Sequence, residues 1–86
     1  MLLTIDIGNT NTVFACFENS VLIKSWRCQT RAGRCADEYA AFIQAQFALH
    51  DIPFSKIKDI IISSVVPDAD FGISKFCKDY FAIMPY

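Results

Sequence analysis

Near the N-terminus, polar residues of the types that bind phosphate and Mg²⁺ follow a short apolar segment. Residues 6–12 read Asp-Ile-Gly-Asn-Thr-Asn-Thr. Asp6 offers carboxylate oxygens, which Mg²⁺ takes as ligands directly or through its bound water. Gly8 has no Cβ, so the backbone can approach a phosphate closely. Successive backbone N–H groups of a turn also form an anion-binding nest. These features predict a site for phosphate groups and for Mg²⁺.

The predicted phosphate-binding segment runs from this acid to the start of the next apolar stretch. We assign to it Asp6, Gly8, Asn9, Thr10, Asn11, Thr12 and Val13. Asp6 is also the predicted Mg²⁺ residue, with a water molecule between the carboxylate and the ion. Phosphoryl transfer needs mostly such positioning and charge neutralisation. The alternative is a plain hairpin, capped by Asp6, in which Gly and Asn tolerate left-handed backbone conformations.

Two serines end a second apolar run. Ser63 and Ser64 follow three consecutive isoleucines at 60–62. Active sites of open α/β sheets lie at the carboxyl ends of strands. Both serines are therefore candidates for contacts on the substrate side. A role in the turn before Pro67 is an equal alternative.

The hydrophobic pattern predicts the elements that position these residues. Apolar segments at 2–7, 12–17 and 21–28, separated by short polar turns, predict three consecutive antiparallel strands. Helical spacing of apolar residues predicts a helix over 36–49 that begins with Asp37 and Glu38, acids that suit a helix N-terminus.

The second half of the chain predicts a parallel addition to this meander. Residues 58–66 form an apolar run without alternation, which is typical of a strand buried on both faces. A second helix is expected from Pro67, with Asp68 and Asp70 at its entry, and residues 82–84 are expected to begin another strand. The predicted fold class is α/β, with a mixed sheet and the order β-β-β-α-β-α-(β).

Composition excludes several classes of protein. The chain has 86 residues, 53% of them hydrophobic, which predicts one small folded domain rather than disorder. Its net charge is −1 and it has no run of Lys or Arg, so we expect no nucleic-acid partner. No apolar stretch approaches the roughly 18–20 residues that span a bilayer, and no basic segment precedes Asp6. We therefore expect a cytoplasmic protein without membrane contact. The four cysteines form no C-x-x-C pair and are expected to be free thiols.

Three motifs resemble those of type III pantothenate kinases. Residues 6–10 are similar to the D-x-G-N-T phosphate motif of that family. Trp26-Arg27 followed by residues 35–39 is similar to its W-R…T-A-D-E-Y, and residues 62–67 are similar to its I-S-S-V-V-P. The motifs occur in the family's order and spacing. Cys35 stands where the family has Thr, which replaces a good helix cap by a poor one.

The resemblance implies an incomplete actin-like (ribonuclease-H-like) domain. Residues 1–86 are then the N-terminal part of the first actin-like domain, and the rest of that domain and a second domain lie outside them. The implied activity of the complete protein is ATP-dependent phosphorylation of pantothenate, the first step of coenzyme A biosynthesis. The implied cofactors are ATP, Mg²⁺ and a monovalent cation, K⁺ or NH₄⁺, and the implied assembly is a homodimer. The general-base Asp of the family is expected beyond residue 86, so the 86-residue chain alone is expected to be inactive.

Two other classes of function stay open. One is a non-catalytic relative or a truncated gene remnant that binds a nucleotide or a partner. The other is a ribonuclease-H-like nuclease, which shares the three-strand opening and an Asp on the first strand. That class needs further carboxylates at strand ends, whereas residues 63–67 read Ser-Ser-Val-Val-Pro. With only two helices predicted, we also expect an exposed apolar patch on one face of the sheet.

Overall fold

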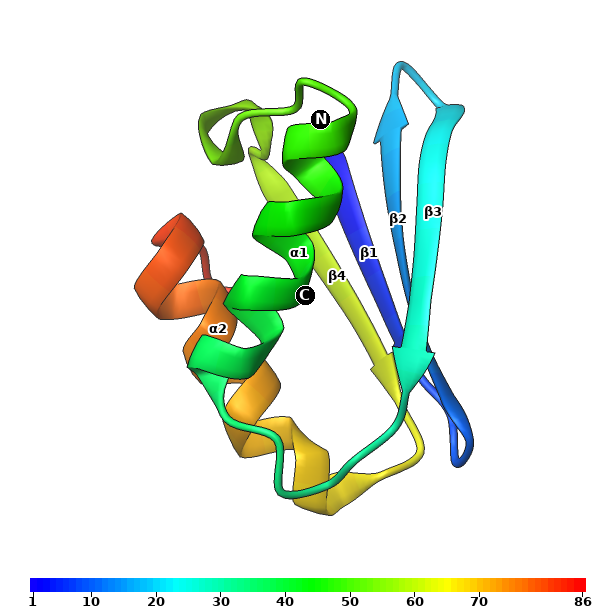
Figure 1. The fold of residues 1–86 in the computed structure, drawn as a ribbon, viewed down its shortest axis with the longest axis vertical. Coiled ribbons are helices and arrows are strands. Elements are labelled where there is room, and N and C mark those ends of the chain that lie inside the picture. Colours follow the sequence, from blue (N-terminus) through cyan, green and yellow to red (C-terminus); the bar gives the residue numbers. More distant parts are fainter.

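A four-strand mixed sheet forms the centre of the computed structural model, which describes residues 1–86 (Figure 1). Its strand order is β3-β2-β1-β4, with β1 antiparallel to β2 and parallel to β4. The strands are β1 (Leu2–Ile7), β2 (Asn11–Glu18), β3 (Val21–Gln29) and β4 (Asp59–Ser64). The helices are α1 (Ala36–Leu49) and α2 (Asp70–Phe81), with short 3₁₀ turns η1 (Phe54–Lys56) and η2 (Pro67–Ala69). This order confirms the predicted meander and the predicted α/β class.

Alternating burial shows which face of the sheet the helices cover. In β1, Leu3, Ile5 and Ile7 are buried, whereas Asp6 between them is exposed. The buried residues join one apolar cluster with Ile43 of α1 and other helix residues. Both helices therefore pack on the same face of the sheet, as Figure 1 shows. We call this the helix face and the other the open face.

Contacts between the helices fix where α1 begins. Tyr80 of α2 donates a hydrogen bond of 2.6 Å to Asp37 in the first turn of α1. The backbone N–H of Cys35 donates to the Glu38 carboxylate at 3.0 Å, and this bond lowers the pKa of Glu38. A Cβ on Gly72 of α2 would lie 2.4 Å from the Arg34 carbonyl oxygen, so only glycine allows this close approach. Both predicted helix-entry acids of α1 are thus part of its N-terminal structure.

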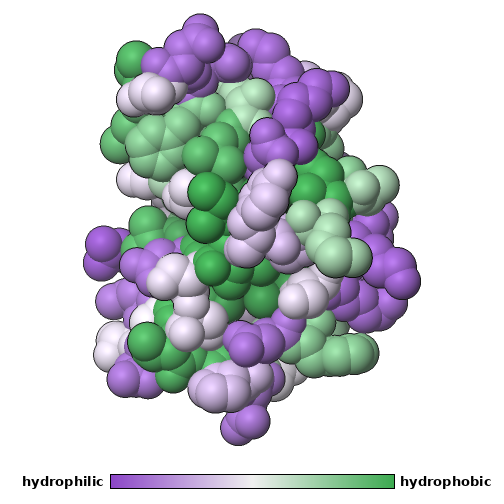
Figure 2. All heavy atoms as spheres, turned by 180° about the vertical axis from the view of Figure 1, so that it is seen from behind, coloured by the Kyte–Doolittle hydropathy of each residue, from purple (hydrophilic) through white to green (hydrophobic).

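The open face carries the exposed apolar side chains that we expected. Figure 2 shows the molecule from behind, with hydrophobic residues gathered centrally and hydrophilic ones mainly around them. Ile61 of β4 is 43% exposed, so the prediction that this strand is buried on both faces of the sheet is wrong for the open face. The reason is that no helix packs behind it. At one end of β3, Leu22 and Ile23 are both exposed, because α1 covers only the part of β3 near Trp26. A register shift leaves Ile23 without a partner on β2 at this point.

The C-terminal residues differ from the predicted strand at 82–84. Ala82 ends α2 in a left-handed conformation with φ 55°, and no strand forms over the next residues. Strand-like pairing begins only at Tyr86, whose N–H donates to Ile60 O at 2.8 Å and whose carbonyl accepts from Ile62 N–H at 2.9 Å. Tyr86 thus lies beside β4, on the side away from β1.

None of the helices is long and apolar enough to cross a membrane.

Candidate phosphate-binding site

The loop between β1 and β2 contains most of the predicted site residues. Its only internal backbone hydrogen bond runs from Gly8 N–H to Asn11 O, at 3.0 Å. No residue of the loop has a positive φ, so the left-handed conformation considered for its Gly and Asn residues is not used. Gly8 is needed for a different reason. A Cβ at Gly8 would lie 3.2 Å from the Asn11 carbonyl oxygen, closer than side chains normally approach.

A residue from outside the loop holds two of its carbonyl groups. The Thr30 hydroxyl donates to Gly8 O at 2.7 Å, and the Thr30 backbone N–H donates to Thr10 O at 2.9 Å. Thr30 follows the last residue of β3 and is partly buried. The sequence-based analysis did not select Thr30, because nothing in its local sequence distinguishes it from an ordinary residue at the end of a strand.

The same hydroxyl determines what Thr12 can do. Thr12 is 1% exposed, and its Oγ1 lies 2.9 Å from Thr30 Oγ1. A hydroxyl has one proton to donate, and Thr30 uses its proton on Gly8 O. Thr12 therefore donates its own proton to Thr30. In this arrangement the Thr12 hydroxyl supports the loop from the helix face and has no proton left for a phosphate.

The remaining polar groups of the loop have no partner in the protein. The backbone N–H groups of Asn9 and Thr10 make no hydrogen bond to the protein, and both residues are exposed. The side chains of Asn9, Thr10 and Asn11 also make none. Two neighbouring free N–H groups with amide and hydroxyl donors beside them form an arrangement suited to an anion.

Asp6 lies next to this loop on the open face. Its pairing partners across the sheet are Val13 of β2 and Ser63 of β4. Asp6 and Ser63 are both exposed and neither side chain has a hydrogen-bond partner. One strand further, Arg27 of β3 pairs with Val13 and is exposed on the same row. The structure thus brings Asp6, Val13 and Ser63 together and adds a cationic residue that the sequence analysis had not selected.

Ser64 is placed differently from Ser63. Its hydroxyl donates to Val66 O at 3.2 Å and accepts from Val66 N–H at 3.1 Å. Val65 N–H donates to Ile7 O at 3.1 Å and ties this turn to the end of β1. Such side-chain to backbone bonds are typical of a local Ser turn. The geometry therefore favours the turn role for Ser64 and leaves Ser63 as the serine beside Asp6.

The site accommodates Mg²⁺ only together with other ligands. No group of three or more His, Cys, Asp or Glu side chains is placed to hold a metal. Mg²⁺ in nucleotide sites takes one or two carboxylates, with water and phosphate oxygens as the other ligands. A single exposed Asp6 beside free N–H donors fits that arrangement.

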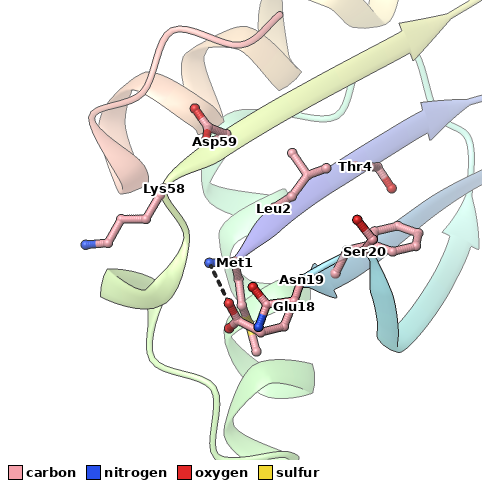
Figure 3. A pocket seen from close by; sticks show the side chains of 9 residues that line it. Met1, Leu2, Thr4, Glu18, Asn19, Ser20, Lys58 and Asp59 are labelled. Atoms are coloured by element: carbon pink, nitrogen blue, oxygen red, sulfur yellow. Dashed lines mark ion pairs between the residues drawn. The ribbon is translucent and has the colours of Figure 1, made fainter.

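A separate hollow lies at the other end of β1 (Figure 3). It has a volume of about 500 Å³ and is lined partly by Leu2, Thr4 and Asp59. The amino group of Met1 lies 3.9 Å from the Glu18 carboxylate at its edge. None of the predicted site residues lines it. All four cysteines are free thiols. Cys16 and Cys77 are buried, and burial raises the pKa of Cys16 to about 11 and of Cys77 to about 12.

Solved structures identify the class of fold. Over 99% of the chain, the structure is similar to YeaZ from Pseudomonas aeruginosa, with a TM-score of 0.66 and 12% sequence identity, covering 42% of that protein. It is also similar, with a TM-score of 0.61 and 9% identity, to a Bacteroides thetaiotaomicron protein with an actin-like ATPase fold, of which it covers 32%. The chain therefore has an incomplete actin-like ATPase fold.

Sequence comparison identifies the family. Residues 2–86 match the model of the family described as type III pantothenate kinase. The chain is 44% identical over all 86 residues to the type III pantothenate kinase of Geotalea uraniireducens. The chain belongs to the type III pantothenate kinase family. It spans about a third of the length of the curated relatives it matches, 34% in this case.

Proposed function

We propose that residues 1–86 supply the phosphate- and Mg²⁺-binding part of an enzyme that phosphorylates pantothenate with ATP. The observation that supports this most directly is the pair of free N–H groups at Asn9 and Thr10 beside the exposed Asp6 carboxylate. Family membership supports the substrate and the reaction. The chain is then the N-terminal part of the first of two actin-like domains.

In this proposal each group near the loop has one task. The N–H groups of Asn9 and Thr10 donate to phosphate oxygens and neutralise part of their charge. The side chains of Asn9, Thr10 and Asn11 add further donors, and Asp6 holds the hydrated Mg²⁺. That ion, when bound, would neutralise charge on the phosphates. Val13 fills the sheet row between Asp6 and Arg27 and thereby separates their charges.

The remaining parts of the proposal rest on the family alone. A general-base Asp that deprotonates the pantothenate hydroxyl would lie beyond residue 86. K⁺ or NH₄⁺, a homodimer and a cytoplasmic location are proposed on the same ground. Ser63, next to Asp6, is the serine that we propose for the substrate side.

The test is an assay of the longest protein that the gene encodes around these residues. We expect phosphopantothenate to form, detected by mass spectrometry, only when ATP, Mg²⁺ and a monovalent cation are all present. The purified 86-residue chain should form none, because it has no residue matching the family's base. MgATP binding without any product from the longer protein would instead support the non-catalytic alternative.

A further inference from the structure

We propose that Thr30 is a positioning residue for the phosphates of ATP. This inference rests on the proposed function of the loop between β1 and β2. Thr30 makes three of the contacts that hold this loop: to Gly8 O at 2.7 Å, to Thr10 O at 2.9 Å and to Thr12 Oγ1 at 2.9 Å. The loop itself supplies only the bond from Gly8 N–H to Asn11 O.

The contact with Gly8 O determines the direction of the Asn9 N–H group. Gly8 C=O and Asn9 N–H belong to one peptide unit, and no peptide bond of the chain is cis. In a trans peptide the C=O and N–H groups point in opposite directions. Holding the Gly8 carbonyl toward Thr30 therefore turns the Asn9 N–H away from Thr30, toward the side where it has no protein partner.

Loss of the hydroxyl removes this constraint. The peptide unit between Gly8 and Asn9 would then be free to rotate, and in the rotated state a carbonyl oxygen would face the phosphate site. A carbonyl oxygen repels a phosphate, whereas an N–H attracts it. Thr30 thus acts on phosphate without touching it.

Thr12 takes part in the same arrangement. Because its proton is donated to Thr30, it orients the Thr30 hydroxyl so that the proton of Thr30 points to Gly8 O. Removing either hydroxyl should therefore affect the same step. The effects of the two substitutions should be less than additive, as expected for residues that share one hydrogen-bond network.

The experiment uses the longest encoded protein and measures binding of MgATP and of adenosine by calorimetry. Thr30→Val keeps the shape of the side chain and the backbone N–H but removes the hydroxyl. We expect it to weaken MgATP binding about tenfold, since one to two hydrogen bonds are lost. Adenosine, which has no phosphate, should bind as to the wild type. Thr30→Ser should restore MgATP binding, and Thr12→Val should weaken it by about threefold.

Thr4→Val is the matched control, since Thr4 lies in β1 and its hydroxyl has no hydrogen-bond partner in the protein. It should change neither affinity. Kinetics of the active enzyme should show a raised KM for ATP in Thr30→Val with an unchanged KM for pantothenate.

The outcomes separate this inference from the proposed function. Wild-type MgATP affinity in both Thr30→Val and Thr12→Val would overturn it, even if pantothenate is phosphorylated. An equal loss of MgATP and adenosine binding would also overturn it, because it would show general damage to the fold. If the wild type binds MgATP without phosphorylating pantothenate, the proposed reaction fails and the affinities still decide the role of Thr30. Should Thr30→Val fail to fold, Thr12→Val carries the test, and wild-type MgATP affinity in Thr12→Val would then overturn the inference.

Discussion

The two turns of the β1-β2-β3 meander have similar lengths but are stabilised in different ways. The turn between β2 and β3 has Asn19 and Ser20 between the paired residues Glu18 and Val21, with φ of 51° and 67°. Positive φ at both central positions matches the right-handed twist of a hairpin. The loop between β1 and β2 uses no positive φ and is held by Thr30, from outside the hairpin.

This difference shows how a turn can be kept available for a ligand. The turn between β2 and β3 is complete by itself and needs nothing from its surroundings. In the loop between β1 and β2, Thr30 binds the carbonyl groups of Gly8 and Thr10 on one side. The Asn9 N–H, which shares a peptide unit with the Gly8 carbonyl, is thereby turned to the other side, and the Thr10 N–H has no protein partner either. Binding residues lie disproportionately on loops that a rigid scaffold positions, and the proposed phosphate site has this form.

We call the loop between β1 and β2 the first turn and the one between β2 and β3 the second turn. Removing the negative charge of Asp6 beside the first turn should have the largest effect. We expect Asp6→Asn to lower kcat/KM for ATP-dependent phosphorylation of pantothenate at least about 100-fold, as is typical for loss of one electrostatic contact to a transition state. The measurement is steady-state kinetics of the longest encoded protein at saturating Mg²⁺. Asp59→Asn is the control, because Asp59 of β4 is an exposed acid like Asp6 but lies at the opposite end of the open face. Equal activity of the Asp6 and Asp59 variants would contradict the role of Asp6.

Adding one methyl group to the first turn should have a smaller effect. The Cβ of Gly8→Ala would lie 3.2 Å from the Asn11 carbonyl oxygen, so the loop must shift by a few tenths of an ångström. We expect kcat/KM for ATP to fall about tenfold, which corresponds to roughly 1.4 kcal/mol. Gly33→Ala is the matched control, since no atom lies within 4 Å of its added Cβ and no glycine has a positive φ. Steady-state kinetics measures this change. If kcat/KM for ATP is equal in the two variants, the spacing of this loop does not matter for the reaction.

The sequence predicted the helices and strands more accurately than the contacts that support the loop between β1 and β2. The helix at 36–49 and the meander followed from hydrophobic spacing, and the turn at residues 8–11 followed from its Gly and Asn residues. That this turn binds phosphate stays a prediction. The open side of β4 did not follow, because a run of isoleucines predicts burial without indicating whether a second layer packs behind it. Thr30 could not be found either, since its importance comes from tertiary contacts with Gly8 and Thr12 across the sheet.

The segment that carries Thr30 continues to the start of α1, which offers a third substitution. Cys35 is the N-cap residue, with an extended backbone, and its sulfur is a weak acceptor. Both contacts of a capping box are present, with the Cys35 side chain facing the Glu38 N–H and the Glu38 carboxylate accepting from the Cys35 N–H. Cys35→Thr would replace the weak sulfur acceptor of this box by a hydroxyl. We expect the free energy of unfolding to rise by about 1 kcal/mol. Urea denaturation measures this, and Cys35→Ala, which also lacks a good acceptor, should produce no gain. MgATP affinity should not change, since the loop geometry depends on Thr30.

The smallest effect is expected at the second turn, between β2 and β3. A substitution there gives the most direct comparison of the two turns. Ser20 holds φ at 67°, a conformation that costs an L-residue about 1–2 kcal/mol, whereas glycine adopts it freely. Glycine also loses more chain entropy on folding, by roughly 0.5–1 kcal/mol, so Ser20→Gly should stabilise the protein by about 0.5 kcal/mol net. Asn9→Gly is the matched substitution in the first turn. Asn9 has no positive φ, so this change relieves no strain and should destabilise the protein by its entropy alone. Opposite signs in urea denaturation would establish that the two turns are stabilised differently. If both substitutions stabilise the protein, the first turn carries left-handed strain after all, and its shape is not set by Thr30.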